Sequence, residues 1–112
     1  MELAAFLEKY QIGIFVKAAP DGTEIVRGTD ADAVTGLYCQ LVGQQDYSVL
    51  KAYLDGQTLL PRMWGMGNVH CIMFPDPDGN VICMFLRFSG DVLALSQQCK
   101  LLMNRYLEEF EW

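Results

Sequence analysis

The sequence predicts an α/β domain of the α+β type, a three-layer sandwich in which helices cover both faces of one five-stranded antiparallel sheet. Two observations lead to this class. Helical periods and strand-like segments follow one another in the order α-β-β-α-β-β-β-α, and two of the strands are apolar on both faces. The 112 residues match the length of one domain, so we expect a single domain spanning 1–112.

The chain is expected to begin with a helix and a hairpin. Residues 2–10 place apolar side chains three and four positions apart, which predicts an amphipathic helix that Gly13 helps to end. Segments 12–19 and 24–28 predict two strands, because the sequence Pro20-Asp21-Gly22 is typical of a three-residue turn with glycine in the left-handed position. In that register Ile14, Val16 and Val26 share one face, and Lys17 and Arg27 share the other.

A helical region follows this hairpin. Thr29 is a typical N-cap residue, and Asp32 three positions later can return the hydrogen bond, so we expect a helix to begin here. Apolar residues three and four positions apart continue this helix over 31–43, and a second helical piece covers 46–54. The middle of the chain is therefore helical.

The second half of the chain contains three strands and the last helix. Pro61 cannot donate a backbone hydrogen bond and suits the edge of a sheet, so we expect a short edge strand near 61–66. Segments 69–74 and 81–87 predict two strong strands, and a long amphipathic helix follows at 89–110.

The turn at residues 77–79 sets the register of the last two strands. Pro77-Asp78-Gly79 predicts a bulged three-residue turn in which Asp76 faces Asn80. One face of the hairpin then carries Ile72, Phe74, Ile82, Met84 and Leu86, and the other carries Cys71, Met73, Cys83 and Phe85. Since both faces are apolar, we expect these strands to be central and covered on both sides.

The composition narrows the classes of partner. Apolar residues make up 52% of the chain and charged residues only 20%, so we expect some apolar surface to remain exposed. The net charge is −6 and the eight Lys and Arg residues are scattered singly, which argues against nucleic acid and membrane surfaces as partners. With no basic signal-peptide start and no apolar run of membrane-spanning length, we expect a cytoplasmic protein.

The sequence offers little for catalysis or metal binding. His70, the single histidine, precedes Cys71, but neighbours on a strand point to opposite faces and cannot form a catalytic dyad. The four cysteines form no C-x-x-C pair and lie in apolar patterns, so we expect reduced thiols: Cys39, Cys71, Cys83 and Cys99. We therefore expect no enzyme activity, no cofactor and no metal site.

Two segments are candidates for contact with other proteins. Trp and Met are enriched in interface cores, and both occur at 62–66. Trp64 is either an anchor for a partner or a side chain folded onto the core of its own chain, and both readings stay open. The acidic end of the chain is either a frayed helix or a docking tail for a basic partner, with Phe110 and Trp112 as its anchors.

These elements resemble the roadblock/LC7 family, whose members have a profilin-like fold. The resemblance is closest over 12–42, where a hydrophobic strand, an Asx-Gly turn, a second strand, a small polar cap and a long helix follow one another. It continues over 69–103 as two apolar strands around an acidic turn and then a helix. The chain departs from the family pattern in its irregular segment at 61–64 and in its long last helix.

The resemblance implies a function without an active site. Family members form homodimers or heterodimers that join their central helices and edge strands into one continuous sheet, and they regulate or scaffold small Ras-like GTPases or serve as dynein light chains. Here the implied dimer surface combines the helix at 31–43 with the strand at 61–66. The candidate interface residues are Val34, Leu37, Tyr38, Leu41, Arg62, Met63, Trp64 and Met66, together with Phe110 and Trp112 at the end of the chain.

Two other classes remain alternatives. An acidic chaperone of the type III secretion kind would bind an unfolded effector segment, although such chaperones place three strands before the second helix and this sequence offers two. A PAS-like or GAF-like sensor would hold a small molecule in a concave sheet face, whereas both faces look filled by large apolar side chains.

Overall fold

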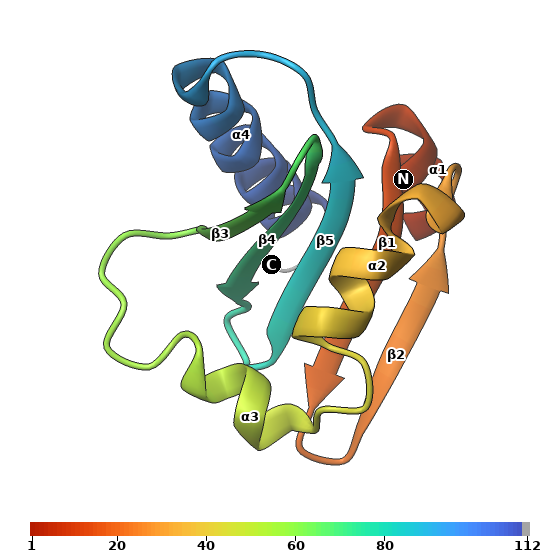
Figure 1. Cartoon of the computed structure of the whole chain (residues 1–112). Helices are drawn as coiled ribbons and strands as arrows, with labels where there is room; N and C mark the ends of the chain where they lie inside the picture. Colours follow the sequence, from red (N-terminus) through yellow and green to blue (C-terminus); the bar gives the residue numbers. More distant parts are fainter. Residues whose placement is uncertain (111–112) are drawn as a thin grey trace.

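The computed structural model describes residues 1–110, and its elements follow the predicted order (Figure 1). In chain order they are α1 (Leu3–Lys9), β1 (Ile12–Ala19), β2 (Gly22–Arg27), α2 (Ala31–Leu41), α3 (Tyr47–Ala52), β3 (Arg62–Met66), β4 (Val69–Pro75), β5 (Val81–Arg87) and α4 (Val92–Phe110). The predicted fold class, α+β with one five-stranded antiparallel sheet, is confirmed.

The strands lie in the order β2-β1-β5-β4-β3, and every neighbouring pair is antiparallel. The edges of the sheet are therefore β2 and β3, and β3 is the edge strand that the sequence predicts. The inner strands β1, β4 and β5 are buried over most of their length. The inner position of β4 and β5 in the sheet thus explains why both of their faces are apolar.

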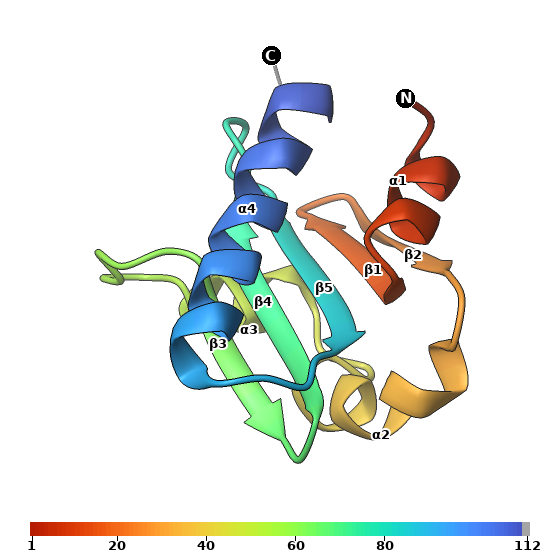
Figure 2. The ribbon, with the colours of Figure 1, turned by 90° about the horizontal axis from the view of Figure 1, so that it is seen from above.

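Helices cover the sheet on both sides, which gives three layers (Figures 1 and 2). On one side α2 and α3 contribute Val34, Leu37 and Leu50 to an apolar core over the sheet. On the other side α1 and α4 contribute Phe6 and Tyr106, among others, to a second core. The sheet separates the two cores, so each face of an inner strand packs against a different pair of helices.

The second hairpin has the predicted turn and register. Phe74 pairs with Ile82, and Gly79 takes the left-handed conformation with φ 84°. The two faces carry the predicted residues: Ile72, Phe74, Ile82, Met84 and Leu86 lie in the core under α1 and α4, and Cys71, Met73, Cys83 and Phe85 lie in the core under α2 and α3. A three-residue turn therefore sets the side on which every apolar residue of β4 and β5 is buried.

A buried carboxylate holds this turn. The side chain of Asp76 accepts hydrogen bonds from the backbone N–H of Asp78 at 3.0 Å and of Asn80 at 2.8 Å, and from the Asn80 amide at 3.0 Å. The Lys17 ammonium on β1 lies 3.6 Å from the same carboxylate, which is fully shielded from solvent. The charge and hydrogen bonds of Asp76 thus fix both the turn and its position beside β1.

The first hairpin differs from the prediction, although its turn has the same Pro-Asp-Gly sequence. Ala19 pairs with Gly22, so the loop contains two residues instead of three. A shift of one residue turns every side chain of a strand to the other face. Val26 therefore lies on the α1 and α4 side, packed against that core, and Arg27 lies on the α2 and α3 side, the reverse of the predicted faces.

Two helix ends also differ from the prediction. The N-cap of α2 is Asp30 instead of Thr29; it has φ 60° and makes no capping hydrogen bond, because its carboxylate accepts a hydrogen bond from Arg87 at 3.0 Å. After α1 the chain reverses at Gln11, with φ 56°, and Gly13 lies inside β1. None of the helices within residues 1–110 has the length and apolar character needed to cross a membrane.

Candidate protein-interaction surfaces

The apolar stripe of α2 lies against the sheet. Val34 and Leu37 are buried, and the Tyr38 ring stands edge-on to Phe85 with the ring centroids 5.6 Å apart. Tyr38 and Leu41 are half-buried at the margin of this core. These four candidate residues therefore hold α2 on the sheet, and a partner meeting α2 from outside would touch the opposite side of the helix.

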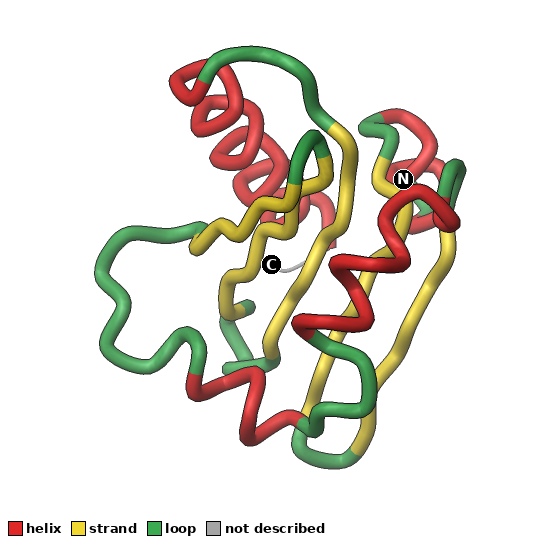
Figure 3. The backbone as a smooth tube through the Cα atoms, viewed as in Figure 1, coloured by secondary structure: helices red, strands yellow, loops and turns green. Residues whose placement is uncertain are grey.

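The aromatic group on β3 folds back onto its own chain. Trp64 is half-buried between the guanidinium of Arg62, 4.8 Å from its ring centroid, and the ring of Tyr53, 5.6 Å away. The same guanidinium donates a hydrogen bond to the backbone carbonyl of Tyr53, and this closes the long loop between α3 and β3 that Figure 3 shows at the side of the sheet. Of the two readings of Trp64, the structure has the one in which it packs on its own chain.

Two methionines on β3 remain on the surface. Met63 is 41% exposed and Met66 is 45% exposed, and three positions along a strand place them on opposite faces of the sheet. Met66 runs toward α2, where a Cβ atom at Gly36 would lie 3.6 Å from its Cε. The exposed side of α2 next to it consists of small and polar residues. We call the following residues the β3–α2 surface: Ala33, Gly36, Cys39 and Gln40 on α2, Met66 on β3, and the backbone edge of β3 at Met63 and Gly65.

The outer edge of β3 offers backbone hydrogen-bonding groups. Met66 and Val69 pair on either side of the two-residue turn that joins β3 to β4. Residues that flank such a turn are hydrogen-bonded to each other, and the direction of the backbone groups alternates along each strand. The N–H and C=O groups of Met63 and Gly65 therefore point away from β4, and no strand within residues 1–110 lies beyond them.

The end of α4 packs on α1. The Phe110 ring lies 5.4 Å from that of Phe6 and 5.2 Å from that of Tyr106, measured between centroids. Phe110 therefore closes the core beneath α1 and α4 and does not stand free as a docking anchor. Trp112, the other anchor expected from the sequence, lies outside the described residues.

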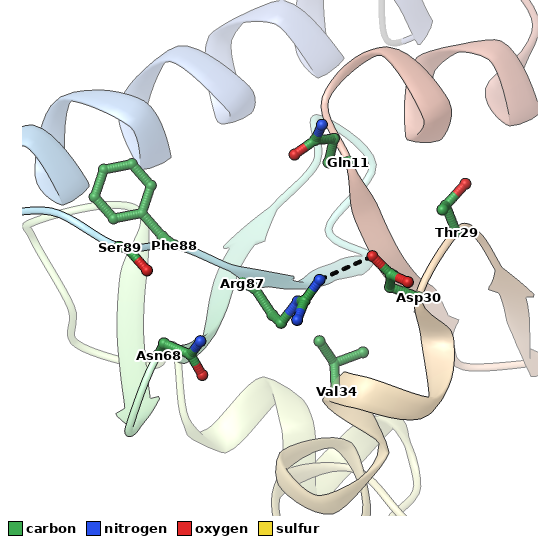
Figure 4. Close-up of a pocket in the computed structure, with 9 residues that line it drawn as sticks. Gln11, Thr29, Asp30, Val34, Asn68, Arg87, Phe88 and Ser89 are labelled. Atoms are coloured by element: carbon green, nitrogen blue, oxygen red, sulfur yellow. Dashed lines mark hydrogen bonds and ion pairs between the residues drawn. The ribbon is translucent and has the colours of Figure 1, made fainter.

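A polar hollow of about 230 Å³ lies where β1, α2 and β5 meet (Figure 4). Its walls come from segments far apart in sequence, at 11–13, 29–34 and 87–89, together with Asn68. Guanidinium, carboxylate, amide and hydroxyl groups line it. No sequence pattern indicated this hollow, because only the folded sheet brings these segments together.

The backbone around the hollow is tightly constrained. Gln11 and Asp30, which both line it, have positive φ values of 56° and 60°. A Cβ atom at Gly13 would lie 2.8 Å from Val34 Cγ2, so α2 can approach β1 this closely only over a glycine. Figure 4 shows the Arg87 side chain reaching from the end of β5 to the Asp30 carboxylate, so this ion pair joins two of the residues that line the hollow.

The histidine and its neighbouring cysteine lie as the sequence predicts. His70 is half-buried near the start of β4, with its Nδ1 3.0 Å from the position of a Cβ atom at Gly65. It pairs with Leu86, whereas the Cys71 side chain is buried in the core on the other side of the sheet. The two side chains therefore cannot exchange a proton.

The cysteines divide into one exposed thiol and three buried ones. Cys39 on α2 is exposed, and Cys71, Cys83 and Cys99 are buried. Burial raises the pKa of Cys71 well above its usual range, and the neighbouring Cys83 adds to this, while burial alone raises the pKa of Cys99 to about 11. Since the thiolate is the reactive form, Cys39 is the thiol open to modification in the folded protein.

Two searches, one for a metal-binding group of side chains and one for similar proteins, gave no result. Within residues 1–110, no three His, Cys, Asp or Glu side chains are grouped so that they could hold a metal ion. The comparisons with known proteins likewise give no match: no protein family, no curated protein and no solved structure is significantly similar to this chain.

Proposed function

We propose that the chain is a non-enzymatic protein-interaction domain. It forms a homodimer through the β3–α2 surface, and the dimer regulates or scaffolds a partner protein, with a small Ras-like GTPase as the first candidate. The proposal rests on the fold and on the surface, and each half of it has a separate test.

The open edge of β3 beside the exposed side of α2 is the observation that carries this proposal. Met63 and Gly65 direct backbone groups outward, so an antiparallel copy of β3 would extend the sheet across a two-fold axis. Met66 and Gly36 lie next to this edge and supply apolar surface and room for close approach of a second α2. An edge strand and a helix face on the same side of the molecule suit one continuous interface.

The resemblance to roadblock/LC7 domains supports the same surface, since family members dimerise through their central helices and edge strands. The filled interior also favours binding at the surface. Both faces of β4 and β5 are packed with large side chains of the two cores, which leaves little room for a ligand within the sandwich. This packing disfavours a sensor that holds a small molecule against the sheet.

Changing Met66 to glutamate is expected to convert a dimer to a monomer. The wild-type chain should sediment at micromolar concentration with twice its mass of 12.6 kDa, and Met66→Glu should sediment as a single chain because it buries a charge in the interface. The control is Leu93→Glu on α4, which adds the same charge at a site that is 68% exposed and outside the β3–α2 surface. It should remain a dimer.

Cross-linking at Cys39 gives a second measure of the same interface. If two α2 helices meet across the axis, a short bis-maleimide should join two chains through Cys39, while Cys39→Ser should not cross-link, because the other three thiols are buried. A strictly monomeric wild type contradicts the proposed dimer. A dimer that Met66→Glu leaves intact would place the interface elsewhere.

The partner half of the proposal is tested with purified proteins. A Ras-like GTPase from the same genome, loaded with GDP or with a GTP analogue, is expected to bind the immobilised chain in at least one nucleotide state. Nucleotide dependence is expected because the switch segments of such GTPases are ordered by the γ-phosphate. If no such GTPase of that genome binds in either nucleotide state, the proposed GTPase partner is contradicted. The proposed homodimer would not be affected by that result.

A further inference from the structure

Within residues 1–110, the second edge of the sheet, β2, lacks the proline, lysine, bulge and covering segment that protect many edge strands, and its only charged side chains are Glu24 and Arg27. Natural edges are blocked by proline, lysine, a bulge or a covering segment. Residues 22–27 contain neither proline nor lysine, and β2 pairs with β1 over six consecutive positions without a bulge. Ile25 in its middle is 45% exposed. In Figures 1 and 2 no other helix or strand of residues 1–110 lies beyond β2.

The hairpin register determines which groups of β2 face outward. Ala19 and Gly22 flank a two-residue turn and are therefore a hydrogen-bonded pair, and the alternation continues along the strand. The N–H of Gly28 donates to the carbonyl of Gly13 at 2.8 Å, as this alternation requires. The backbone N–H and C=O groups that point away from β1 belong to Thr23, Ile25 and Arg27. An extended polypeptide can form hydrogen bonds with this row of outward backbone N–H and C=O groups.

Surface hollows flank this edge at both ends. At the start of β2, two shallow, open hollows of about 390 Å³ and 400 Å³ adjoin the turn, one extending to Asp46 and the other to Glu24, and both are lined by Asp21 and Thr23. At its end, a hollow of about 290 Å³ lies between Arg27 and Glu8 of α1. A strand paired with β2 would run from one end to the other and place its side chains next to these hollows.

The charges around the edge favour a basic segment. Carboxylates line the hollows at Glu8, Asp21, Glu24 and Asp46, against two cations, Lys17 and Arg27. Lys17 already lies against the Asp76 carboxylate. Hydrogen bonds from the Ser48 hydroxyl and the Val49 N–H lower the pKa of Asp46, so this carboxylate stays ionised at neutral pH. The same local excess of carboxylates opposes pairing of β2 with the β2 edge of a second copy, because like charges would meet there.

We propose that β2 binds an extended, basic segment of a partner protein, which adds a sixth strand to the sheet by antiparallel or parallel pairing with Thr23, Ile25 and Arg27. Backbone hydrogen bonds supply the affinity, and lysine or arginine side chains entering the acidic hollows supply the preference for basic sequences. The site lies at the opposite edge of the sheet from β3, so it does not depend on the proposed dimer.

The test uses a short capped peptide of alternating lysine and valine, titrated into the isotope-labelled full chain and followed by amide chemical shifts. We expect the largest shifts at Thr23, Ile25 and Arg27. Ile25→Pro removes the central outward N–H without breaking the ladder to β1, and it should weaken binding by about tenfold. Ile25→Ala keeps that N–H and is the matched control, with a loss of about threefold.

Four outcomes overturn the proposal. They are no shift with peptide at millimolar concentration, shifts centred on Met63 and Gly65 instead, equal binding to Ile25→Pro, and equal binding of a peptide with glutamate in place of lysine. Self-association that Ile25→Pro abolishes would assign β2 to a second copy of the chain. Met66→Glu should leave peptide affinity unchanged, so failure here and failure of the dimer are distinguished. Melting curves of the Ile25 variants verify that they fold.

Discussion

Replacing Asp76 with alanine is expected to destabilise the fold by about 2–4 kcal/mol. The change leaves the N–H groups of Asp78 and Asn80 without their acceptor, removes the counter-charge of Lys17 and opens a cavity beside β1. Total stabilities of small proteins are about 5–15 kcal/mol, so the loss is a large fraction of the whole. Urea unfolding followed by circular dichroism measures it.

Asp78→Ala is the matched control for this change. Asp78 is exposed in the same turn, and only its backbone N–H contacts the Asp76 carboxylate. Its replacement should alter the unfolding free energy by no more than about 0.5 kcal/mol. Equal effects of the two substitutions would show that the turn tolerates loss of the buried carboxylate, and that the hydrogen bonds around Asp76 contribute little.

Gly28→Ala is expected to destabilise the fold by about 3 kcal/mol, at the upper end of the range for overpacking. A Cβ atom at Gly28 would lie 2.2 Å from the backbone carbonyl oxygen of Ile12 and 3.5 Å from Leu7 Cβ. The clash is with backbone, so relief requires β1 and the chain after β2 to separate. That movement would also break the hydrogen bond from Gly28 to Gly13. Thermal unfolding gives the measurement.

Gly36→Ala provides the comparison for Gly28→Ala. Gly36 lies within α2, and its nearest neighbour to an added Cβ is the flexible end of Met66 at 3.6 Å, an ordinary contact distance. Alanine is preferred over glycine inside a helix by about 0.5–1 kcal/mol, so this variant should be as stable as the wild type or more stable. If Gly28→Ala were equally stable, β1 and the β2–α2 connection would not be in the close contact described.

The two hairpins show where sequence reasoning succeeds and where it stops. Both turns contain Pro-Asp-Gly, yet only the second is a three-residue turn. The differences lie in the flanking residues, where the second turn has Asp76 and Asn80 and the first has Ala19 and Thr23. The Asp76 carboxylate binds the N–H groups of the longer loop, and alanine has no group that can do so. The Pro-Asp-Gly sequence alone therefore predicts that a hairpin forms. The neighbouring side chains decide how many residues the loop contains and which face of the sheet each side chain occupies.

The helix ends depend on contacts that are distant in sequence. Thr29 has a suitable side chain for an N-cap, but Asp30 takes that position, and its carboxylate binds Arg87, 57 residues later, and makes no capping hydrogen bond. Local capping rules contain no information about such a partner. The order of elements and the central position of β4 and β5 were predictable because they follow from periodicity, which each segment carries within itself. The edge strand β3 was predicted from Pro61, which cannot donate a backbone hydrogen bond.

Sequence patterns also could not separate interface residues from core residues. Apolarity selected Val34 and Leu37 on α2, and apolarity is also what selects residues for the core, where the structure places them. The exposed side of that helix is marked by a small residue, Gly36, which sequence patterns do not distinguish from a weak helix position. On β3 the exposed residues are Met63, Gly65 and Met66, and the two methionines were among the predicted candidates.

The strand order has a consequence for misassembly. β1 and β5 join residues that are 63 to 74 positions apart, and this pairing is where the hairpin of β1 and β2 meets the meander of β3, β4 and β5. Before the two units dock, β1 and β5 are themselves edges, and both carry large apolar side chains on each face. In a chain whose two units have not yet docked, β1 and β5 are therefore exposed apolar edges with which a strand of another chain can pair. Aggregation then competes with correct folding at the pairing of β1 with β5.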